Sequence, residues 1–585
     1  MEVLQNVGIL YSARSRRFYI DEAKKTGQVY PFLGPEGQLT WLVGQNAYLA
    51  VNGLSNMLRR WGIKFDVLGE GSLNESVLRY YNFIFIPNAA QLEEKTIYQL
   101  RGWASGGKKL IISGHSNLPD ALLGIEFKMT YLPSKPVWIH WADSLSFEPG
   151  SRTHLVHPPQ YSIPKVRKNR FSVSLGNLVE FQKNEVPAEG GEIVGDGAIV
   201  SEPSIYFVPP IFEFIGGLLQ GHIDIEEMRP YLKQKADFFI EELILYIEKI
   251  LKSYGCKSMW DTRLRIWGGY DHVFVLRHDV DHSRDLSYLE YEKKHAIPAT
   301  YSILKDKNWK FWLAKTQGIP CFERAYHFST NKEGVIKKCL HPHEFIEDPK
   351  AVLGKGLALQ IENTQKKFRI PFKTLQRHGP FFYYPEFIAS LDHVFEKFPH
   401  LLGSGTLFRY TCFRYHSSET LFKKYVVPEP HVSVSFWFPF KMTISTVDGQ
   451  RLLRGWESPH FVEPDDVMIE HVFENSTRVE NGVYTFGFHP AHAQRATFRE
   501  EGNFPLYLRS IKKARERGWW FANLEMVYHR LNQWETLKFR YEEEKMMILN
   551  PSDEVFYDLF IQDGSKRVHV KEVPPNKWLL LERKG

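Results

Sequence analysis

The sequence predicts a multidomain protein of the α/β class. Strand and helix patterns alternate over roughly the first 115 residues, and a second alternation runs from about 266 to 535. The tail from about 536 instead alternates apolar and polar residues, as a small β domain does. A chain of 585 residues is too long for one ordinary core, so we expect several domains. Strands separated by helices imply parallel sheets.

The first domain, expected over 1–255, opens with the apolar strand VGILYS (7–12). A helix follows, because apolar residues recur at helical spacing around Leu54, Met57, Leu58 and Trp61. Three more strands are expected, with the residues GIKFDVL (62–68), YNFIFIPN (81–88) and KKLIISG (108–114). A second helix ends near Trp103. This order is typical of a doubly wound, flavodoxin-like sheet.

The rest of the first domain is expected to be a β-rich insertion around 130–222 and a helix over about 226–253. GEIVGDGAIVS and the apolar segment after it are expected to return to the first sheet. The motifs VGILYS, FIFIPNA and WASGGKKLIISG resemble class I glutamine-amidotransferase-like domains. Such enzymes need a cysteine nucleophile, and the sequence has no cysteine before Cys256. The resemblance therefore implies a scaffold, or a surface through which a homo-oligomer forms.

The central domain, expected over 266–535, begins with VFVLRHDVDHS (273–283). Four apolar residues run directly into Arg277, His278, Asp279, Asp281 and His282. In α/β sheets, ligands bind beyond the carboxyl ends of the parallel strands. The position of these ionisable residues therefore predicts a functional site.

The same region resembles the polysaccharide deacetylase family, in the branch whose first motif reads Arg-His-Asp-Val-Asp. The further matching segments are EYEKKHAIPATYS, CLHPHEF (339–345), a helix over 355–379 that leads to a strand tip with Arg377 and His378, and FGFHPAHAQ (486–494). The resemblance covers about half of the chain. It implies the chitooligosaccharide deacetylase homology barrel, an irregular (β/α) barrel of seven or eight strands.

The resemblance also implies a divalent metal, with zinc the ion that we expect. In such a site a carboxylate and two imidazoles hold the ion, which polarises a carbonyl and lowers the pKa of bound water. A second carboxylate is the base, and a further imidazole protonates the leaving group. By the family pattern, Asp279 is the base, Asp281 and His341 bind the metal, and His489 is the acid.

The second motif departs from the family pattern. Family members usually carry a second histidine one helical turn after the first, but position 345 is Phe345. His341 therefore has no partner at that spacing. The third ligand is open between His378, His343 and His327, and we favour His378 because it lies at another expected strand tip.

The function that follows is metal-dependent deacetylation of an acetylated carbohydrate or glycoconjugate. Arg277 and Arg377 are expected either to hold the carboxylates in orientation or to bind the substrate. Two alternatives stay open: a non-catalytic carbohydrate-binding relative of the barrel, and a hydrolase of a small non-sugar amide. Fold-level analogy does not separate these three.

Composition limits the partners and the location. The 74 Lys and Arg against 68 Asp and Glu give a net charge of +6 without a long basic run, so nucleic acid is not an expected partner. The N-terminal sequence MEVLQNVGIL does not have the pattern of a signal peptide. The most apolar stretch, 207–219, is too short and too interrupted to span a bilayer. We therefore expect a cytoplasmic protein.

Overall fold

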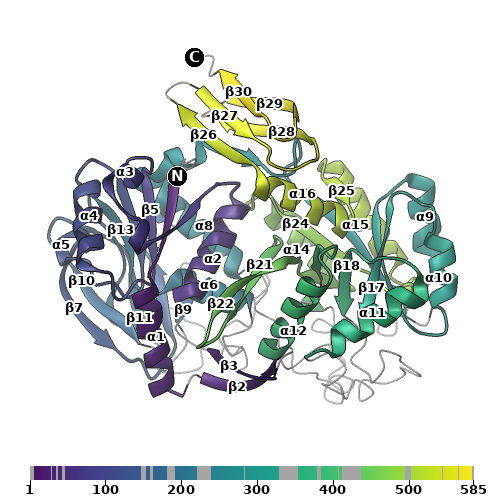
Figure 1. The fold of residues 1–585 in the computed structure, drawn as a ribbon, viewed down its shortest axis with the longest axis horizontal. Helices are drawn as coiled ribbons and strands as arrows, with labels where there is room; N and C mark the ends of the chain where they lie inside the picture. The colour runs from purple at the N-terminus through teal and green to yellow at the C-terminus, as the bar shows by residue number, and fades with distance from the viewer. Residues whose placement is uncertain are drawn as a thin grey trace. The chain divides into compact units, whose positions relative to one another are not determined.

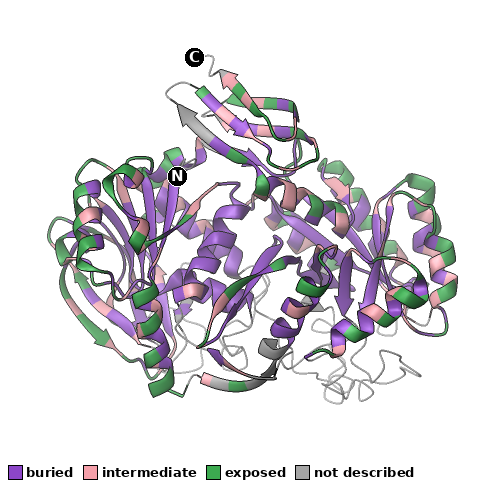
Figure 2. Ribbon diagram, in the orientation of Figure 1, coloured by how far each residue is buried: buried purple, intermediate pink, exposed green. Residues whose placement is uncertain are grey.

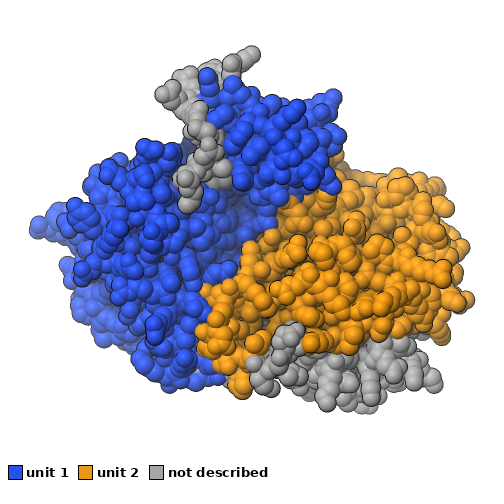
Figure 3. All heavy atoms as spheres, in the orientation of Figure 1, with its two compact units in different colours: residues 1–30, 42–268, 533–585 blue, residues 31–41, 269–532 orange. Residues whose placement is uncertain are grey.

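The computed structural model shows a mixed α/β protein with several sheets (Figure 1). It describes residues 6–27, 29–34, 37–42, 47–145, 153–157, 162–180, 191–220, 239–281, 283–328, 354–377, 384–405, 408–411, 436–494, 502–542, 545–563 and 566–582. The chain forms two compact units (Figure 3). The first comprises 1–30, 42–268 and 533–585, and the second comprises 31–41 and 269–532.

The first unit is built on a nine-stranded sheet. Its strands, in spatial order, are β4 (Asp66–Gly69), β1 (Val7–Tyr11), β5 (Phe83–Pro87), β6 (Lys109–Ser113), β13 (Ser204–Phe207), β12 (Glu192–Val200), β11 (Val173–Glu180), β8 (Val137–Trp141) and β9 (Thr153–His157). Neighbours from β4 to β13 are parallel, and those from β13 to β9 are antiparallel. Of the residues expected to return to the first sheet, those of β12 and β13 do so, whereas Ile211–Leu219 form a helix instead.

Helices and a second small sheet complete this part of the first unit. The helices are α1 (Ala13–Lys25), α2 (Ala47–Arg60), α3 (Glu75–Leu78), α4 (Glu94–Ala104), α5 (Asp120–Leu123), α6 (Ile211–Leu219) and α8 (Phe239–Leu251). Strands β7 (Ile125–Tyr131) and β10 (Ile163–Lys168) pair antiparallel. The strand expected over 62–68 begins only at Asp66, because Gly62 ends α2 with a left-handed φ of 72°.

Helices α2 and α6 approach each other backbone to backbone. A methyl group added at Gly53 would lie 2.1 Å from the carbonyl oxygen of Phe212. One added at Gly216 would lie 2.3 Å from the carbonyl oxygen of Leu49. Only glycine fits at these two positions, since any larger residue would overlap the backbone of the facing helix.

The tail is β-structured and belongs to the first unit. Strands β26 (Lys538–Glu542), β27 (Lys545–Leu549) and β30 (Trp578–Glu582) form one sheet. Strands β28 (Phe556–Asp563) and β29 (Lys566–Val573) form a second one with β14 (Thr262–Arg265), which precedes the central region in the sequence. An ion pair of 2.8 Å joins Arg59 of α2 to Glu535, which lies just before β26 in the sequence.

The second unit contains the larger sheet. In spatial order its strands are β20 (Phe408–Thr411), β23 (His460–Val462), β24 (Val483–Gly487), β15 (Val273–Asp279), β16 (Ala299–Leu304), β17 (Phe322–Phe328), β18 (Thr374–Arg377), β19 (Gly403–Ser404), β22 (Gln450–Glu457) and β21 (Phe440–Ser445), and β25 (Trp520–Ala522) also pairs with β15. All neighbours from β20 to β22 are parallel. Parallel pairing brings the carboxyl ends of these strands to one edge.

The helices of the second unit separate these strands in the sequence. They are α9 (Ser287–His295), α10 (Trp309–Thr316), α11 (Gly356–Phe368), α12 (Tyr384–Lys397), α14 (Asp466–Ser476), α15 (Phe504–Glu516) and α16 (Leu524–Thr536), whose last turn from Gln533 belongs to the first unit. The helix expected over 355–379 is wrong in its length: α11 ends at Phe368 because Arg369 adopts a left-handed φ of 57°. The chain then continues into β18, which ends at Arg377.

A short segment from the start of the chain also belongs to the second unit. Strands β2 (Val29–Gly34) and β3 (Gly37–Leu42) pair with each other. Trp41 forms an antiparallel bridge with Thr446, and the amide of Val447 donates a hydrogen bond of 3.3 Å to the carbonyl of Thr40. The hairpin is therefore held by residues that lie far away in the sequence.

Burial follows the sheets, as Figure 2 shows. Strand β15 is buried over its whole length, including the side chains of Arg277, His278 and Asp279. Charged groups inside a core need ion-pair or hydrogen-bond partners, so the end of this strand is expected to lie in an ordered network of polar side chains. Among the described residues, no helix combines the length and apolar character that crossing a bilayer requires.

Candidate active site

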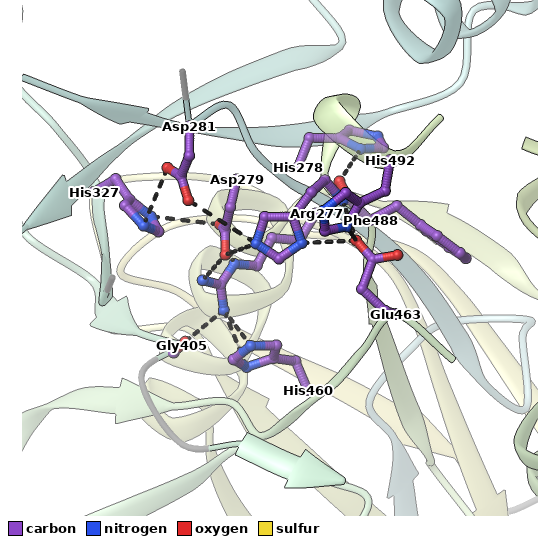
Figure 4. A network of polar contacts seen from close by, with 11 residues as sticks. Arg277, His278, Asp279, Asp281, His327, Gly405, His460, Glu463, Phe488 and His492 are labelled. Atoms are coloured by element: carbon purple, nitrogen blue, oxygen red, sulfur yellow. Dashed lines mark hydrogen bonds and ion pairs between the residues drawn. The ribbon is translucent and has the colours of Figure 1, made fainter. Parts of the chain in front are cut away.

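A polar cluster lies at the carboxyl ends of β15, β17 and β24 in the second unit (Figure 4). Asp279 is the last residue of β15, and Asp281 follows two positions later. His327 is the second-last residue of β17, and His489 follows β24 by two residues. β24 pairs with β15, and β16 joins β15 to β17, so the sheet order itself brings these residues together.

Arg277 holds Asp279 in a fixed orientation. Arg277 Nε donates to Asp279 Oδ1 at 2.9 Å and Nη2 donates to Oδ2 at 2.7 Å, which is a two-pronged contact. Nη1 donates to the carbonyl of Gly405 at 2.8 Å and lies 2.6 Å from Nε2 of His460. The guanidinium is fully buried. Of the two roles expected for Arg277, this geometry is that of orienting a carboxylate.

The surroundings also keep Asp279 ionised. Burial alone would raise the pKa of Asp279, but the positive charges of Arg277, His327 and His489 lower it below its ordinary value. A carboxylate that is charged at neutral pH can accept a proton from water. The electrostatics therefore suit Asp279 to the role of a general base.

Two histidines face the aspartates at distances longer than hydrogen bonds. His327 Nδ1 lies 3.4 Å from Asp279 Oδ1, and His327 Nε2 lies 3.5 Å from Asp281 Oδ1. His489 Nε2 lies 3.8 Å from Asp279 Oδ2 and 3.9 Å from Asp281 Oδ2. Hydrogen bonds between nitrogen and oxygen are shorter, at about 2.7–3.2 Å. Two ligands bound at about 2.1 Å to one tetrahedral ion stand about 3.4 Å apart, so the spacing suits a shared cation.

His489 is held from its other side by Glu463. His489 Nδ1 lies 2.7 Å from Glu463 Oε1, and the backbone amide of His489 donates to the same oxygen at 2.7 Å. Because a carboxylate only accepts, Nδ1 carries a proton, and Nε2 faces the aspartates. Burial would lower the pKa of His489, but the hydrogen bond and charge of Glu463, with the charges of Asp279 and Asp281, raise it to about 9. His489 can therefore hold a proton at neutral pH.

A second buried network braces the backbone beside His489. His278 Nδ1 lies 2.9 Å from the carbonyl oxygen of Phe488, and its Nε2 lies 2.7 Å from Glu292 Oε1. The hydroxyls of Tyr301 and Tyr507 donate to the same carboxylate, at 2.6 and 3.0 Å. His278 therefore serves as a support for the strand end that carries the proposed acid.

The other residues singled out in the sequence are placed as follows. Arg377 ends β18 and is buried, with Phe328 of β17 as its partner in the sheet register. His341, His343, Phe345 and His378 lie outside the described residues.

Sequence reasoning missed three residues of the site: His460, Glu463 and His492. Glu463 directly follows the buried strand β23, just as Asp279 ends β15, and this parallel could have singled it out. His492 lies in a His-Pro-Ala-His sequence, whose spacing of three is a usable signal for paired imidazoles. His460 begins β23, and no local pattern distinguishes it from a core residue.

No family model and no curated protein matches the chain. Among solved structures, an α-L-fucosidase isoenzyme 2 from Paenibacillus thiaminolyticus is 15% identical over 40% of this chain and 33% of its own, with a TM-score of 0.24. A GH42 β-galactosidase from G. stearothermophilus is 12% identical over 39% of this chain and 30% of its own, with a TM-score of 0.25. The chain thus spans about a third of the length of each of these two enzymes. A candidate polysaccharide deacetylase involved in O-antigen biosynthesis, from Bordetella bronchiseptica, is 13% identical over 45% of this chain and 83% of its own, with a TM-score of 0.22.

Proposed function

We propose that this protein is a metal-dependent hydrolase that removes acetyl groups from an N- or O-acetylated carbohydrate or glycoconjugate. One observation carries the proposal: two aspartates face two histidines across 3.4–3.9 Å at the ends of three strands. In this proposal the parallel strands of the second unit form an irregular (β/α) barrel of the deacetylase type. The first unit is then an amidotransferase-like scaffold that lacks a nucleophile, through which a homo-oligomer would form.

Asp281 is the proposed metal ligand, and His327 joins it as a candidate. His327 Nε2 lies 3.5 Å from Asp281 Oδ1, which is the spacing of two atoms bound to one ion. The sequence favoured His378 over His327 as a ligand. His341 and His378 stay proposed ligands from outside the described residues. Oxygen and nitrogen donors of this kind suit zinc, and a bound divalent ion would polarise the acetyl carbonyl and lower the pKa of the attacking water.

The general base and the general acid of the proposed reaction are both residues that the structure describes. Asp279, fixed by Arg277 and charged at neutral pH, would take the proton of the attacking water. His489, whose Nδ1 is held by Glu463, would give the proton of its Nε2 to the departing amine or alkoxide. The base and the acid are thus 3.8 Å apart, and each is oriented by its own buried partner.

The proposal is tested by metal content and acetate release. The purified protein, the Asp281→Ala variant and the His327→Ala variant are assayed for bound zinc, and for acetate released from acetylated hexosamine oligosaccharides. An Asp448→Ala variant, changed at an exposed turn, is the matched control. We expect near-stoichiometric zinc and acetate release in the wild type and the control, and loss of both in the two site variants. Absence of metal and of acetate release in the wild type, even after incubation with zinc, cobalt or manganese, would contradict the proposal.

A further inference from the structure

Glu463, His489 and His492 bring three ligand atoms within 4.8 Å of one another. Glu463 Oε1 lies 2.7 Å from His489 Nδ1 and 3.4 Å from His492 Nδ1, and Figure 4 shows His492 and Glu463 side by side. His489 directly precedes the 3₁₀ turn Pro490–His492, and His492 is its last residue. Side chains three positions apart in a 3₁₀ turn lie almost above one another. The local backbone therefore directs both imidazoles to one carboxylate.

The composition and burial of this cluster suit a cation. One carboxylate and two imidazoles are a common protein ligand set for zinc. Glu463 is only 4% exposed, and within the described residues its second oxygen, Oε2, is buried without a hydrogen bond. The imidazoles are more open, with 24% and 23% of the His489 and His492 side chains exposed. An ion could therefore reach a buried carboxylate that has an acceptor atom to spare.

We propose that Glu463, His489 and His492 form a second divalent-cation site, and that zinc bound there inhibits the enzyme. The binding is inferred from the ligand types and their proximity, whereas the order in which the sites fill and the inhibition rest on the proposed function of Asp281 and His489. An ion on His489 Nδ1 replaces the proton that this atom shares with Glu463, and it removes Glu463 as the support of the ring. His489 then no longer delivers a proton to the leaving group.

The same distances make this site weaker than a preformed metal site. His489 Nδ1 and Glu463 Oε1 are 2.7 Å apart, whereas two ligands of one tetrahedral ion stand about 3.4 Å apart. The ring and the carboxylate must separate before an ion enters, and a hydrogen bond is lost in doing so. Zinc therefore occupies this site only in excess, after the site at Asp281 has been filled.

Equilibrium binding of zinc tests the second cation site without any measurement of activity. Wild-type protein, His492→Gln and the control His295→Gln, which changes an exposed histidine of α9, are dialysed to equilibrium against increasing concentrations of zinc alone. We expect the wild type and the control to bind one more equivalent than His492→Gln, with a Kd at least about tenfold weaker than that of the first equivalent. Equal zinc uptake by the wild type and His492→Gln would overturn the site.

An activity measurement then tests the inhibition. Acetate release is compared at one equivalent of zinc and at the concentration that fills the second site, with each protein referred to its own rate at one equivalent. We expect the wild type and His295→Gln to lose most of their activity, and His492→Gln to retain it. Equal inhibition of all three would refute the inhibitory role. Absence of turnover in every protein would instead contradict the proposed function, while the dialysis result still decides the metal site.

Discussion

Replacing Arg277 by methionine tests whether the guanidinium holds a buried negative charge. The variant removes the two hydrogen bonds to Asp279, at 2.9 and 2.7 Å, and the one to the Gly405 carbonyl at 2.8 Å. Asp279 then stays buried without its cation, and breaking a buried pair on one side costs about 3–5 kcal/mol. We therefore expect Arg277→Met to lower the free energy of unfolding by about that amount.

A double variant separates the cost of the buried charge on Asp279 from the cost of the other contacts that Arg277 makes. In Arg277→Met with Asp279→Asn the buried charge is gone, and what remains is mainly the Gly405 carbonyl without its donor, which costs about 1–3 kcal/mol. The double variant should therefore be more stable than the single one. Urea unfolding of metal-stripped protein, followed by tryptophan fluorescence and by far-ultraviolet circular dichroism, measures both. The reasoning fails if Arg277→Met unfolds at the wild-type urea concentration, or if Asp279→Asn restores nothing.

Three further predictions concern the proton on His489, the buried carboxyl of Glu323 in β17, and the packing of α6 on α2. Glu463→Gln removes the charge that raises the pKa of His489, so His489 loses its proton at a lower pH. The alkaline limb of the kcat/KM profile should therefore move to lower pH. An unmoved limb would contradict the role of His489 as the acid. Burial raises the pKa of Glu323 from 4.5 to about 7, so the fold favours the neutral acid, and stability present below pH 4.5 is lost as the pH rises through 7. The loss amounts to about 3 kcal/mol, and Glu323→Gln should abolish it in denaturant titrations across this pH range. Gly216→Ala forces a methyl group to within 2.3 Å of a backbone oxygen of α2 and should lower the melting temperature by several degrees. The control Gly102→Ala places a methyl group on α4 with nothing within 4 Å of it, so the melting temperature should stay equal or rise.

The sequence showed the strand that carries Asp279 because its first four residues are all apolar, and such runs are the strongest local signal for a buried strand. It did not show β17 in the same way. That strand, FERAYHF, is buried although it contains Glu323 and His327, and buried polar residues weaken the apolar pattern. His327 was therefore weighed as a ligand only behind His378.

The sequence also could not predict which side chains of the site contact one another. Nothing local to Glu463 says that it contacts His489, because the two follow different strands and meet only through the pairing of β23 with β24. The same holds for Arg277, whose neighbour Asp279 is local but whose contacts with Gly405 and His460 depend on the whole sheet. Residue types and strand ends could be predicted, whereas the pairing of side chains required the fold.

The hairpin of β2 and β3 has a consequence for how the protein forms on the ribosome. Trp41 is made long before its partner Thr446, and the strands that complete the first unit follow later still. At about 5–20 residues per second, the 585 residues take roughly half a minute to two minutes to synthesise. During that time the nascent hairpin has no sheet to join, and the first unit lacks β28. Neither unit can finish folding in the order of its synthesis, so chaperone protection of the growing chain should matter more here than for domains arranged end to end.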